Sequence, residues 1–186
     1  MSSRKATKRV SKADWLATAL EFLGREGIGG VRVERLAREI GIAKSGFYWH
    51  FRDRAHLLQE MLDYWSHEYT GVVSENPEVS ALEPKQRLRV IAEMIIDYDL
   101  AQYDLAMRAW ADQDETVAER VAEVYRNRLR YLRKAFRELG FEGAELDMRV
   151  RLFVCYHSWE RTMFWREPKK KLRAMIKRRV ELLTSR

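Results

Sequence analysis

The sequence has little of what several large protein classes require. Its 186 residues include one cysteine, Cys155, which excludes an internal disulfide framework and a cysteine-based zinc cluster. No run of about 18 apolar residues occurs, so we expect no segment to cross a membrane. Residues 1–5 precede no apolar stretch. We therefore expect no secretory signal and a cytoplasmic protein.

Proline is almost as rare, with three residues, and the apolar residues between the prolines recur at helical spacing. No segment alternates apolar and polar residues between turn signals, as a half-buried strand would. Ser11 and Asp14 predict a capping box, Gly41 predicts a tight turn, and Asp53 predicts a further helix cap. We expect an all-α chain with a loop at about 75–84 and helices at about 12–26, 33–40, 44–50, after 53, 85–98, 101–112, 115–139, 145–166 and 169–184.

Positive charge is concentrated at one end of the chain. The formal net charge is +7, and residues 1–56 hold 12 of the 35 Lys and Arg residues but only 6 of the 28 Asp and Glu residues. The rest of the chain is therefore nearly neutral. A basic segment joined to a neutral one favours a polyanion-binding head on a body with another task, although a solubilising surface would look the same.

Two short predicted helices joined at Gly41 match a helix-turn-helix DNA reader, braced by the longer first helix. In such a unit the second helix lies in the major groove and the first crosses the DNA backbone. A helical hairpin buried in a core is the alternative. A core helix of seven residues would be mostly aliphatic, whereas the segment at 44–50 concentrates hydrogen-bonding and aromatic side chains: Lys44, Ser45, Tyr48, Trp49 and His50.

The stretch from Val33 to Phe51, VERLAREIGIAKSGFYWHF, followed by Asp53-Arg54 and Leu57-Leu58, resembles the DNA-binding domain of the TetR family of bacterial transcriptional regulators. The resemblance covers about residues 11–62. It implies an amino-terminal three-helix helix-turn-helix domain and a larger helical ligand-binding and dimerisation domain, about nine helices in all. The expected parts are a basic arm at 1–10, the DNA-binding domain at 11–56 and the second domain at 57–186.

The resemblance also implies which residues contact DNA. Lys44 and Ser45 correspond to residues that touch bases and phosphates. Tyr48 and His50 correspond to phosphate donors, and Arg54 can approach a phosphate near the start of the next helix. The full set of expected DNA contacts is Arg32, Ala43, Lys44, Ser45, Tyr48, Trp49, His50 and Arg54.

Two positions depart from the common family pattern. The family often has Ser or Thr at the places of Arg32 and Ala43, so a helix cap and one polar contact are in doubt here. Phe47 and Phe51 correspond to core residues of the family, and we expect them to pack inside rather than to contact DNA.

For the second domain, the resemblance implies a homodimer that binds a palindromic operator and is released from it by a small hydrophobic or aromatic ligand. Repression is the family's commoner mode. The apolar stripes of the last two predicted helices fit a dimer interface and an intramolecular core equally well. Flat amphipathic side chains suit a ligand pocket, although most aromatics at helical spacing form plain core. The expected pocket residues are Trp65, Met107, Trp110 and Trp159.

Two other classes of function compete with this interpretation. The four histidines show no metal-binding spacing on a helix, and Cys155 and His157 fall on different sides of one. We therefore expect no enzyme, no metal and no cofactor. The expected partners are double-stranded DNA, a second copy of the chain and an unidentified small molecule. The second alternative is a ligand-independent DNA-binding protein or a helical adaptor for another protein.

Overall fold

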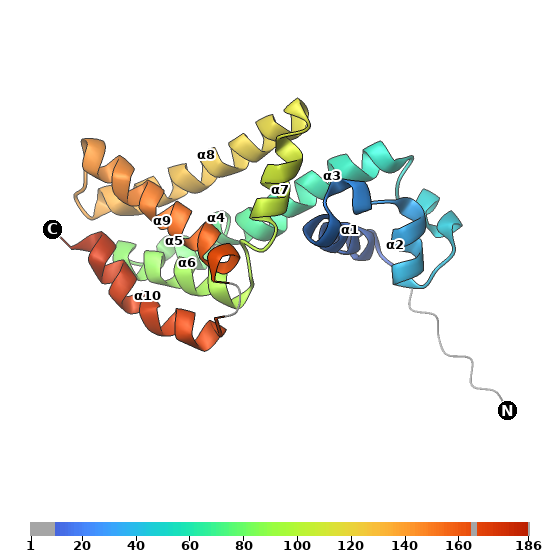
Figure 1. Cartoon of the computed structure of the whole chain (residues 1–186). Helices are drawn as coiled ribbons and strands as arrows, with labels where there is room; N and C mark the ends of the chain where they lie inside the picture. Colours follow the sequence, from blue (N-terminus) through green and yellow to red (C-terminus); the bar gives the residue numbers. More distant parts are fainter. Residues whose placement is uncertain (1–9, 165–166, 186) are drawn as a thin grey trace. The chain divides into compact units, whose positions relative to one another are not determined.

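Helices make up both parts of the chain. The computed structural model describes residues 10–164 and 167–185. Every regular element among these residues is a helix (Figure 1), which confirms the predicted all-α fold. The chain divides into two compact units, Met1–Tyr64 and Trp65–Arg186, which we call the head and the body. The basic arm predicted at 1–10 lies outside the described residues except for Val10.

Local capping signals determine the first helix of the head. Helix α1 spans Lys12–Glu26, and Ser11 and Asp14 cap it reciprocally. The Asp14 N–H donates to Ser11 Oγ at 3.2 Å, and the Ser11 N–H donates to Asp14 Oδ2 at 2.7 Å, which confirms the predicted capping box. The helix ends at Gly27, with φ 69°. The short 3₁₀ helix η1 (Ile28–Gly30) follows.

The next elements form the helix-turn-helix and the exit from the head. Helix α2 spans Val33–Ile40, and the 3₁₀ helix η2 spans Lys44–Trp49. Both predicted helices are confirmed, and the 3₁₀ geometry of η2 goes beyond the prediction. Helix α3 spans Arg54–Ser66, and its last two residues belong to the body. The His56 N–H donates to Asp53 Oδ1 at 2.8 Å, which confirms the predicted cap.

Aromatic side chains fill the core of the head. Phe47 is fully buried and lies edge-on to Trp15, with ring centroids 5.4 Å apart. It also stacks on Phe51, whose centroid is 5.2 Å away and which is itself buried. Both phenylalanines therefore have the packing role that we expected. Because Trp15 belongs to α1, these contacts anchor η2 to the first helix.

The body begins with an irregular helical stretch. After α3 the backbone forms a π-helical turn, η3 (His67–Gly71), and continues through the short helices α4 (Val72–Ser74) and α5 (Pro77–Ala81). The longer helices of the body are α6 (Pro84–Asp97), α7 (Asp104–Ala111), α8 (Glu115–Glu138), α9 (Gly143–Met163) and α10 (Lys169–Thr184).

Helix α5 corrects the sequence-based prediction. We expected a loop at about 75–84, and that expectation is wrong over Pro77–Ala81. The side chain of Asn76 accepts hydrogen bonds from the N–H groups of Glu78 and Val79 at 2.9 and 3.1 Å. Asparagine before the helix and proline at its first position are both favourable for a helix start, so the signal was present in the sequence.

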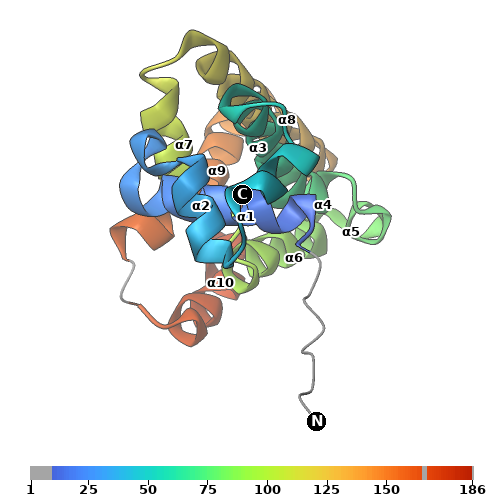
Figure 2. The ribbon, with the colours of Figure 1, turned by 90° about the vertical axis from the view of Figure 1, so that its right-hand side faces the viewer.

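The longer helices enclose the core of the body. Helix α10 packs along α6, and the pair lies side by side in both ribbon views (Figures 1 and 2). Helix α8 packs against α7 and α9. Large apolar side chains from α6, α8, α9 and α10 meet in one cluster, which includes Leu88, Ile91, Phe136, Phe153, Leu172 and Ile176. No helix in the described part of the chain is long and apolar enough to cross a membrane.

Candidate nucleic-acid interface and body cavity

A single left-handed residue sets the turn between α2 and η2. Gly41 has φ 80° and ψ 31°, a conformation that a side chain would strain. Its N–H donates to the carbonyls of Ala37 at 3.0 Å and Arg38 at 3.2 Å, and the Ile42 N–H donates to the Ala37 carbonyl at 3.0 Å. The turn closes the end of α2 and places Lys44, the first residue of η2, on the surface of the head.

Four residues of η2 and the residue before it are exposed. Phe47 is buried, whereas its neighbours Tyr48 and Trp49 have 59% and 87% of their surfaces exposed. An exposed pair of aromatic side chains held by a buried third is typical of a contact surface. We call the following residues the recognition surface: Ala43, Lys44, Ser45, Tyr48 and Trp49. The structure therefore brings together five of the eight residues for which we expect DNA contacts.

An acid on α2 holds the lysine of the recognition surface. Lys44 Nζ donates to Glu34 Oε1 at 2.5 Å. This hydrogen bond lowers the pKa of the Glu34 carboxyl and raises the pKa of the Lys44 ammonium, so both groups are charged at neutral pH. Any other acceptor would have to compete with this carboxylate for Lys44. Sequence reasoning missed Glu34, which lies ten residues before Lys44 in the chain.

Arg32 and Arg54 brace the connection between α1 and α2. Arg54 Nε donates to the Val31 carbonyl at 2.7 Å, and Arg54 Nη2 donates to the Ile28 carbonyl at 2.9 Å. Arg32 Nε donates to the Gly29 carbonyl at 3.0 Å and its side chain does not cap α2. Both arginines are exposed. A guanidinium has five N–H groups, so each keeps donors for a phosphate.

His50 connects the end of η2 to the start of the described chain. Its Nε2 lies 3.2 Å from the carbonyl oxygen of Val10, the last residue of the predicted basic arm. Lys12 lies nearby in sequence, with its Nζ 2.8 Å from a carboxylate oxygen of Glu60 and 5.7 Å from the centroid of the Phe51 ring. His50 is half-buried and contacts the backbone of Val10, so it does not belong to the recognition surface.

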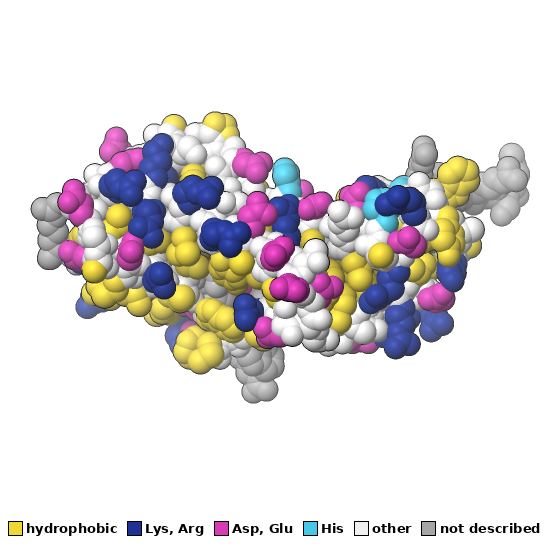
Figure 3. Space-filling model, turned by 90° about the horizontal axis from the view of Figure 1, so that it is seen from above, with side chains coloured by type: hydrophobic (Ala, Val, Ile, Leu, Met, Phe, Trp, Pro, Cys, Tyr) yellow, Lys and Arg dark blue, Asp and Glu magenta, His cyan; other side chains and the backbone are white. Residues whose placement is uncertain are grey.

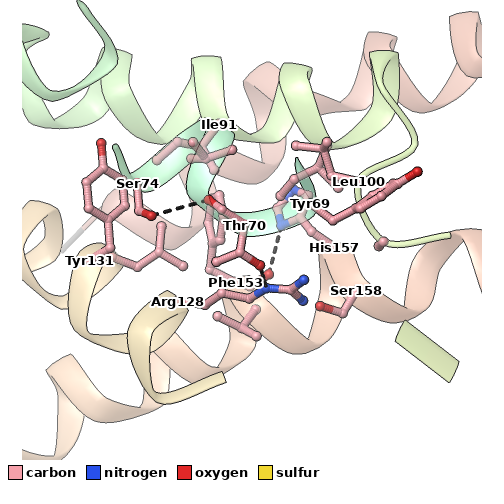
Figure 4. A pocket seen from close by; sticks show the side chains of 15 residues that line it. Tyr69, Thr70, Ser74, Ile91, Leu100, Arg128, Tyr131, Phe153, His157 and Ser158 are labelled. Atoms are coloured by element: carbon pink, nitrogen blue, oxygen red, sulfur yellow. Dashed lines mark hydrogen bonds between the residues drawn. The ribbon is translucent and has the colours of Figure 1, made fainter. Parts of the chain in front are cut away.

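The body contains a small cavity of about 60 Å³ (Figure 4). Its apolar wall comes from α4, α6, α8 and α9 and from the segment after α6, and its polar residues include Tyr69, Thr70, Ser74, Arg128, Tyr131 and His157. The four expected pocket residues do not line this cavity. Trp65, Met107 and Trp110 are buried elsewhere in the body, and Trp159 is exposed on α9.

A buried ion pair forms one side of the cavity. Arg128 on α8 donates from Nη1 to Asp104 Oδ2 at 2.6 Å and from Nη2 to Asp104 Oδ1 at 3.1 Å. Its Nε donates to Thr70 Oγ1 at 2.9 Å. The guanidinium carbon also lies 5.7 Å from the Trp65 ring centroid and 5.1 Å from that of Tyr125. Arg128 thereby joins α8 to α7 and to the π-helical turn η3.

His157 lies in the wall of the cavity with one ring nitrogen unsatisfied. Its Nδ1 is 2.8 Å from the Phe153 carbonyl oxygen, and its Nε2 is buried without a hydrogen-bond partner among the described residues. Burial lowers the pKa of His157 to about 4, and the positive charge of Arg179 acts in the same direction. The imidazole is therefore neutral at physiological pH.

The polar residues of the cavity were not found from the sequence. Thr70 and Arg128 of the cavity, and Asp104 that pairs with Arg128, occur on three separate helical segments, and no local pattern relates them. For His157 alone the sequence indicated a buried position, because it lies in an apolar stripe of α9 with Val150 and Phe153.

Comparisons with known proteins agree with the geometry of the head. The sequence profile of the bacterial regulatory proteins of the tetR family matches residues 16–61. The HTH-type transcriptional regulator AcrR of Shigella flexneri is 26% identical over 81 residues, which make up 44% of this chain and 36% of that protein. The chain matches less than half of the length of its curated relatives.

Solved structures share the fold along nearly the whole chain. A putative TetR-family transcriptional regulator from Rhodococcus sp. superimposes with a TM-score of 0.69 at 19% identity, over 96% of this chain and 100% of that one. FadR from Bacillus subtilis, solved in complex with stearoyl-CoA, gives 0.71 at 16% identity over 94% and 98%. Residues 16–61 are therefore similar to the tetR family of bacterial regulatory proteins, and the chain along nearly its whole length shares its fold with solved TetR-family regulators.

Proposed function

We propose that the protein is a transcriptional repressor that binds a palindromic operator as a homodimer and is released from it by a small ligand in the body. The observation that carries this proposal is the recognition surface. Its Lys44, Ser45 and Tyr48 side chains can donate to bases or phosphates from one exposed face of a short, firmly anchored helix.

The surrounding residues suit DNA as the partner. Lys44 can reach the O6 and N7 acceptors of guanine, and Trp49 offers an apolar face to a thymine methyl group. Arg32 and Arg54 flank the recognition surface in sequence, and each keeps N–H donors for the phosphate backbone. Phosphate contacts supply affinity at any sequence, whereas the residues of η2 supply the choice of sequence.

Replacing Lys44 and Tyr48 by alanine together should abolish sequence selection. We expect duplexes selected from a random pool by the unmodified protein to share a palindromic motif, because a two-fold dimer reads two half-sites. The Lys44→Ala, Tyr48→Ala variant should bind the selected duplex at least about 100-fold more weakly, since two contacts of about 1–3 kcal/mol each are lost in every half-site.

The matched control removes the same residue types elsewhere. Lys85 and Tyr98 are exposed on the body, so the Lys85→Ala, Tyr98→Ala variant should select the same motif with unchanged affinity. If no motif emerges although salt-sensitive binding persists, the head is a non-specific polyanion binder. If neither variant differs from the unmodified protein on the selected duplex, the recognition surface is not the DNA-reading surface.

An exposed apolar face on the last two helices supports the homodimer. On α9 its residues recur every three or four positions and so lie on one side of the helix. Figure 3 shows hydrophobic side chains gathered along the lower edge of the body. Continuous apolar patches are rare on monomers, and a second copy would cover this face symmetrically. The exposed residues are Met148, Leu152, Tyr156, Trp159 and Met163 of α9, Phe164 directly after it, and Met175 and Leu182 of α10.

A charge on this face should separate the two copies. We expect the unmodified protein to sediment at twice the mass of the chain, and Leu152→Glu to sediment as a monomer. Because two-fold symmetry places each substitution twice in the interface, the dissociation constant should rise at least about 100-fold, about 2.7 kcal/mol. Cys155 is exposed on α9 between Leu152 and Tyr156, so its thiol should react faster with a labelling reagent once the copies separate.

The control for the dimer variant is Leu105→Glu on α7. Leu105 is 46% exposed and Leu152 is 49% exposed, so the two substitutions add the same charge to equally accessible leucines. Leu105→Glu should leave both mass and thiol reactivity unchanged. An unmodified protein that sediments as a monomer at micromolar concentration, bound to operator or free, would contradict the proposed homodimer.

The cavity and the π-helical turn support a ligand-responsive body. Tyr69 and Thr70 belong both to the cavity wall and to η3, which directly follows the helix that leaves the head. π-helical turns inside helices are frequently functional, and a ligand that fits one form of this turn better than another would shift the equilibrium between the forms. FadR of Bacillus subtilis, a protein of this fold, was solved in complex with stearoyl-CoA, which supports the binding of a small molecule by this chain. A cavity of about 60 Å³ is far too small for an acyl chain of that length without rearrangement, so a smaller ligand suits it better.

A further inference from the structure

The ring of His157 leaves one hydrogen-bond acceptor unsatisfied in the cavity wall. The Phe153 carbonyl 2.8 Å from Nδ1 can only accept, so the proton of the neutral ring is on Nδ1 and Nε2 carries a lone pair. Nε2 is buried and has no partner within the described part of the chain. Figure 4 shows the ring among Tyr69, Thr70 and Leu100 of the cavity. A group that donates to Nε2 would remove the penalty of an unpaired buried acceptor.

The described residues of the cavity offer no free charge to a ligand. Among them Arg128 alone carries a formal charge, and Asp104 binds both Nη atoms of its guanidinium. Thr70 accepts from Nε. An anionic ligand would have to compete with the buried Asp104 carboxylate, and a cation would meet an arginine. An uncharged ligand avoids both costs.

We propose that the cavity binds a small uncharged hydroxyl compound, such as a phenol, whose O–H donates to Nε2 of His157. The inference rests on the proposed function of the body as the ligand-binding part of a regulator. The hydroxyl pairs with the buried Nε2 acceptor of His157, while Ile91, Leu100 and Phe153 surround the carbon skeleton.

The size of the cavity connects binding to the π-helical turn. Its volume of about 60 Å³ has room for water but falls short of the roughly 150 Å³ of a cavity that holds benzene. A ring-sized ligand therefore enters only when a wall moves. The wall includes Tyr69 and Thr70 of η3, so a ligand of this size favours a displaced form of that turn.

Three matched compounds test the proposal on the full-length protein. Phenol has the hydroxyl donor, fluorobenzene has nearly the same shape without one, and benzoate adds a negative charge. By titration calorimetry we expect phenol to bind at least about tenfold more tightly than either. The ¹⁵N resonance of His157 Nε2 should shift with phenol alone, because it reports hydrogen bonding at that nitrogen. Equal affinity for phenol and fluorobenzene, or an unchanged Nε2 resonance at saturating phenol, would overturn the proposal.

Two variants assign the effect to His157. His157→Phe keeps a flat ring without an acceptor, so it should bind phenol and fluorobenzene equally. His67→Phe changes an exposed histidine of the same unit and should retain the preference for phenol.

If His157→Phe fails to fold, the ¹⁵N measurement on the unmodified protein still decides whether phenol donates to Nε2. If phenol binds as expected but does not release the selected duplex, the cavity proposal stands and the proposed ligand response fails. If the duplex is selected but phenol does not bind, the cavity proposal alone fails.

Discussion

Replacing Asp104 by asparagine should lower the free energy of unfolding of the body by about 3–5 kcal/mol, the usual effect of removing one partner of a buried ion pair. Asp104 and Arg128 are joined by two hydrogen bonds of 2.6 and 3.1 Å, and Asp104 is almost completely buried. The asparagine has nearly the same shape, so the loss comes from leaving the guanidinium charge of Arg128 inside the body without an opposite charge. Urea unfolding followed by circular dichroism and tryptophan fluorescence measures the change.

An exposed pair on the same helix provides the control. Arg108 Nη2 lies 2.9 Å from Asp112 Oδ1, and both side chains are mostly exposed. Asp112→Asn should therefore cost less than about 1 kcal/mol. A double variant, Asp104→Leu with Arg128→Met, should be more stable than Asp104→Asn, because it removes the uncompensated charge. If Asp104→Asn and Asp112→Asn cost the same, burial of the Arg128 pair does not stabilise the body.

The elements that sequence reasoning predicted well depend on neighbouring residues. Ser11 and Asp14 are three positions apart, and their reciprocal hydrogen bonds define the start of α1 without help from the rest of the chain. Gly41 similarly ends α2 through its own backbone conformation. The missed helix α5 also had a local signal, the pair Asn76-Pro77, which the flanking loop residues obscured. These features could be read from a few consecutive residues.

The cavity could not be predicted in the same way because its polar residues are distant in sequence. Thr70, Arg128 and His157 line the cavity only after η3, α8 and α9 have packed together, and Asp104 of α7 holds Arg128 there. The apolar residues of α9 show a related limit, since two stripes run along this helix. The stripe through Val150, Phe153 and His157 is buried in the body, whereas the stripe through Leu152 is exposed. Periodicity marks both as apolar and cannot assign one to the core and the other to a partner.

The buried His157 should make the body less stable as the pH falls from 7 to 5. Its pKa in the folded protein is lowered to about 4, mainly by burial, against an ordinary value of 6.5 in the unfolded chain. Between these values the unfolded chain binds a proton that the folded protein does not, so stability falls as the pH decreases. The loss from this residue should be about 2 kcal/mol at pH 5 and about 3 kcal/mol near pH 4, at about 1.4 kcal/mol per pKa unit.

The comparison at pH 7 and pH 5 isolates the histidine. The pKa of Glu26 is lowered by its hydrogen bond with Arg35, and that of Glu60 by its hydrogen bond with Lys12, so the stability that these carboxylates contribute is lost only below their ordinary value of 4.5. His157→Phe should lose about 2 kcal/mol less than the unmodified protein between the two pH values, and His67→Phe should behave like the unmodified protein.

A ligand that donates to Nε2 requires the neutral ring, so phenol should stabilise the body at pH 7. If His157→Phe and the unmodified protein lose the same stability between pH 7 and pH 5, the ring is not buried as a neutral imidazole, and the acceptor on which the cavity proposal depends is absent.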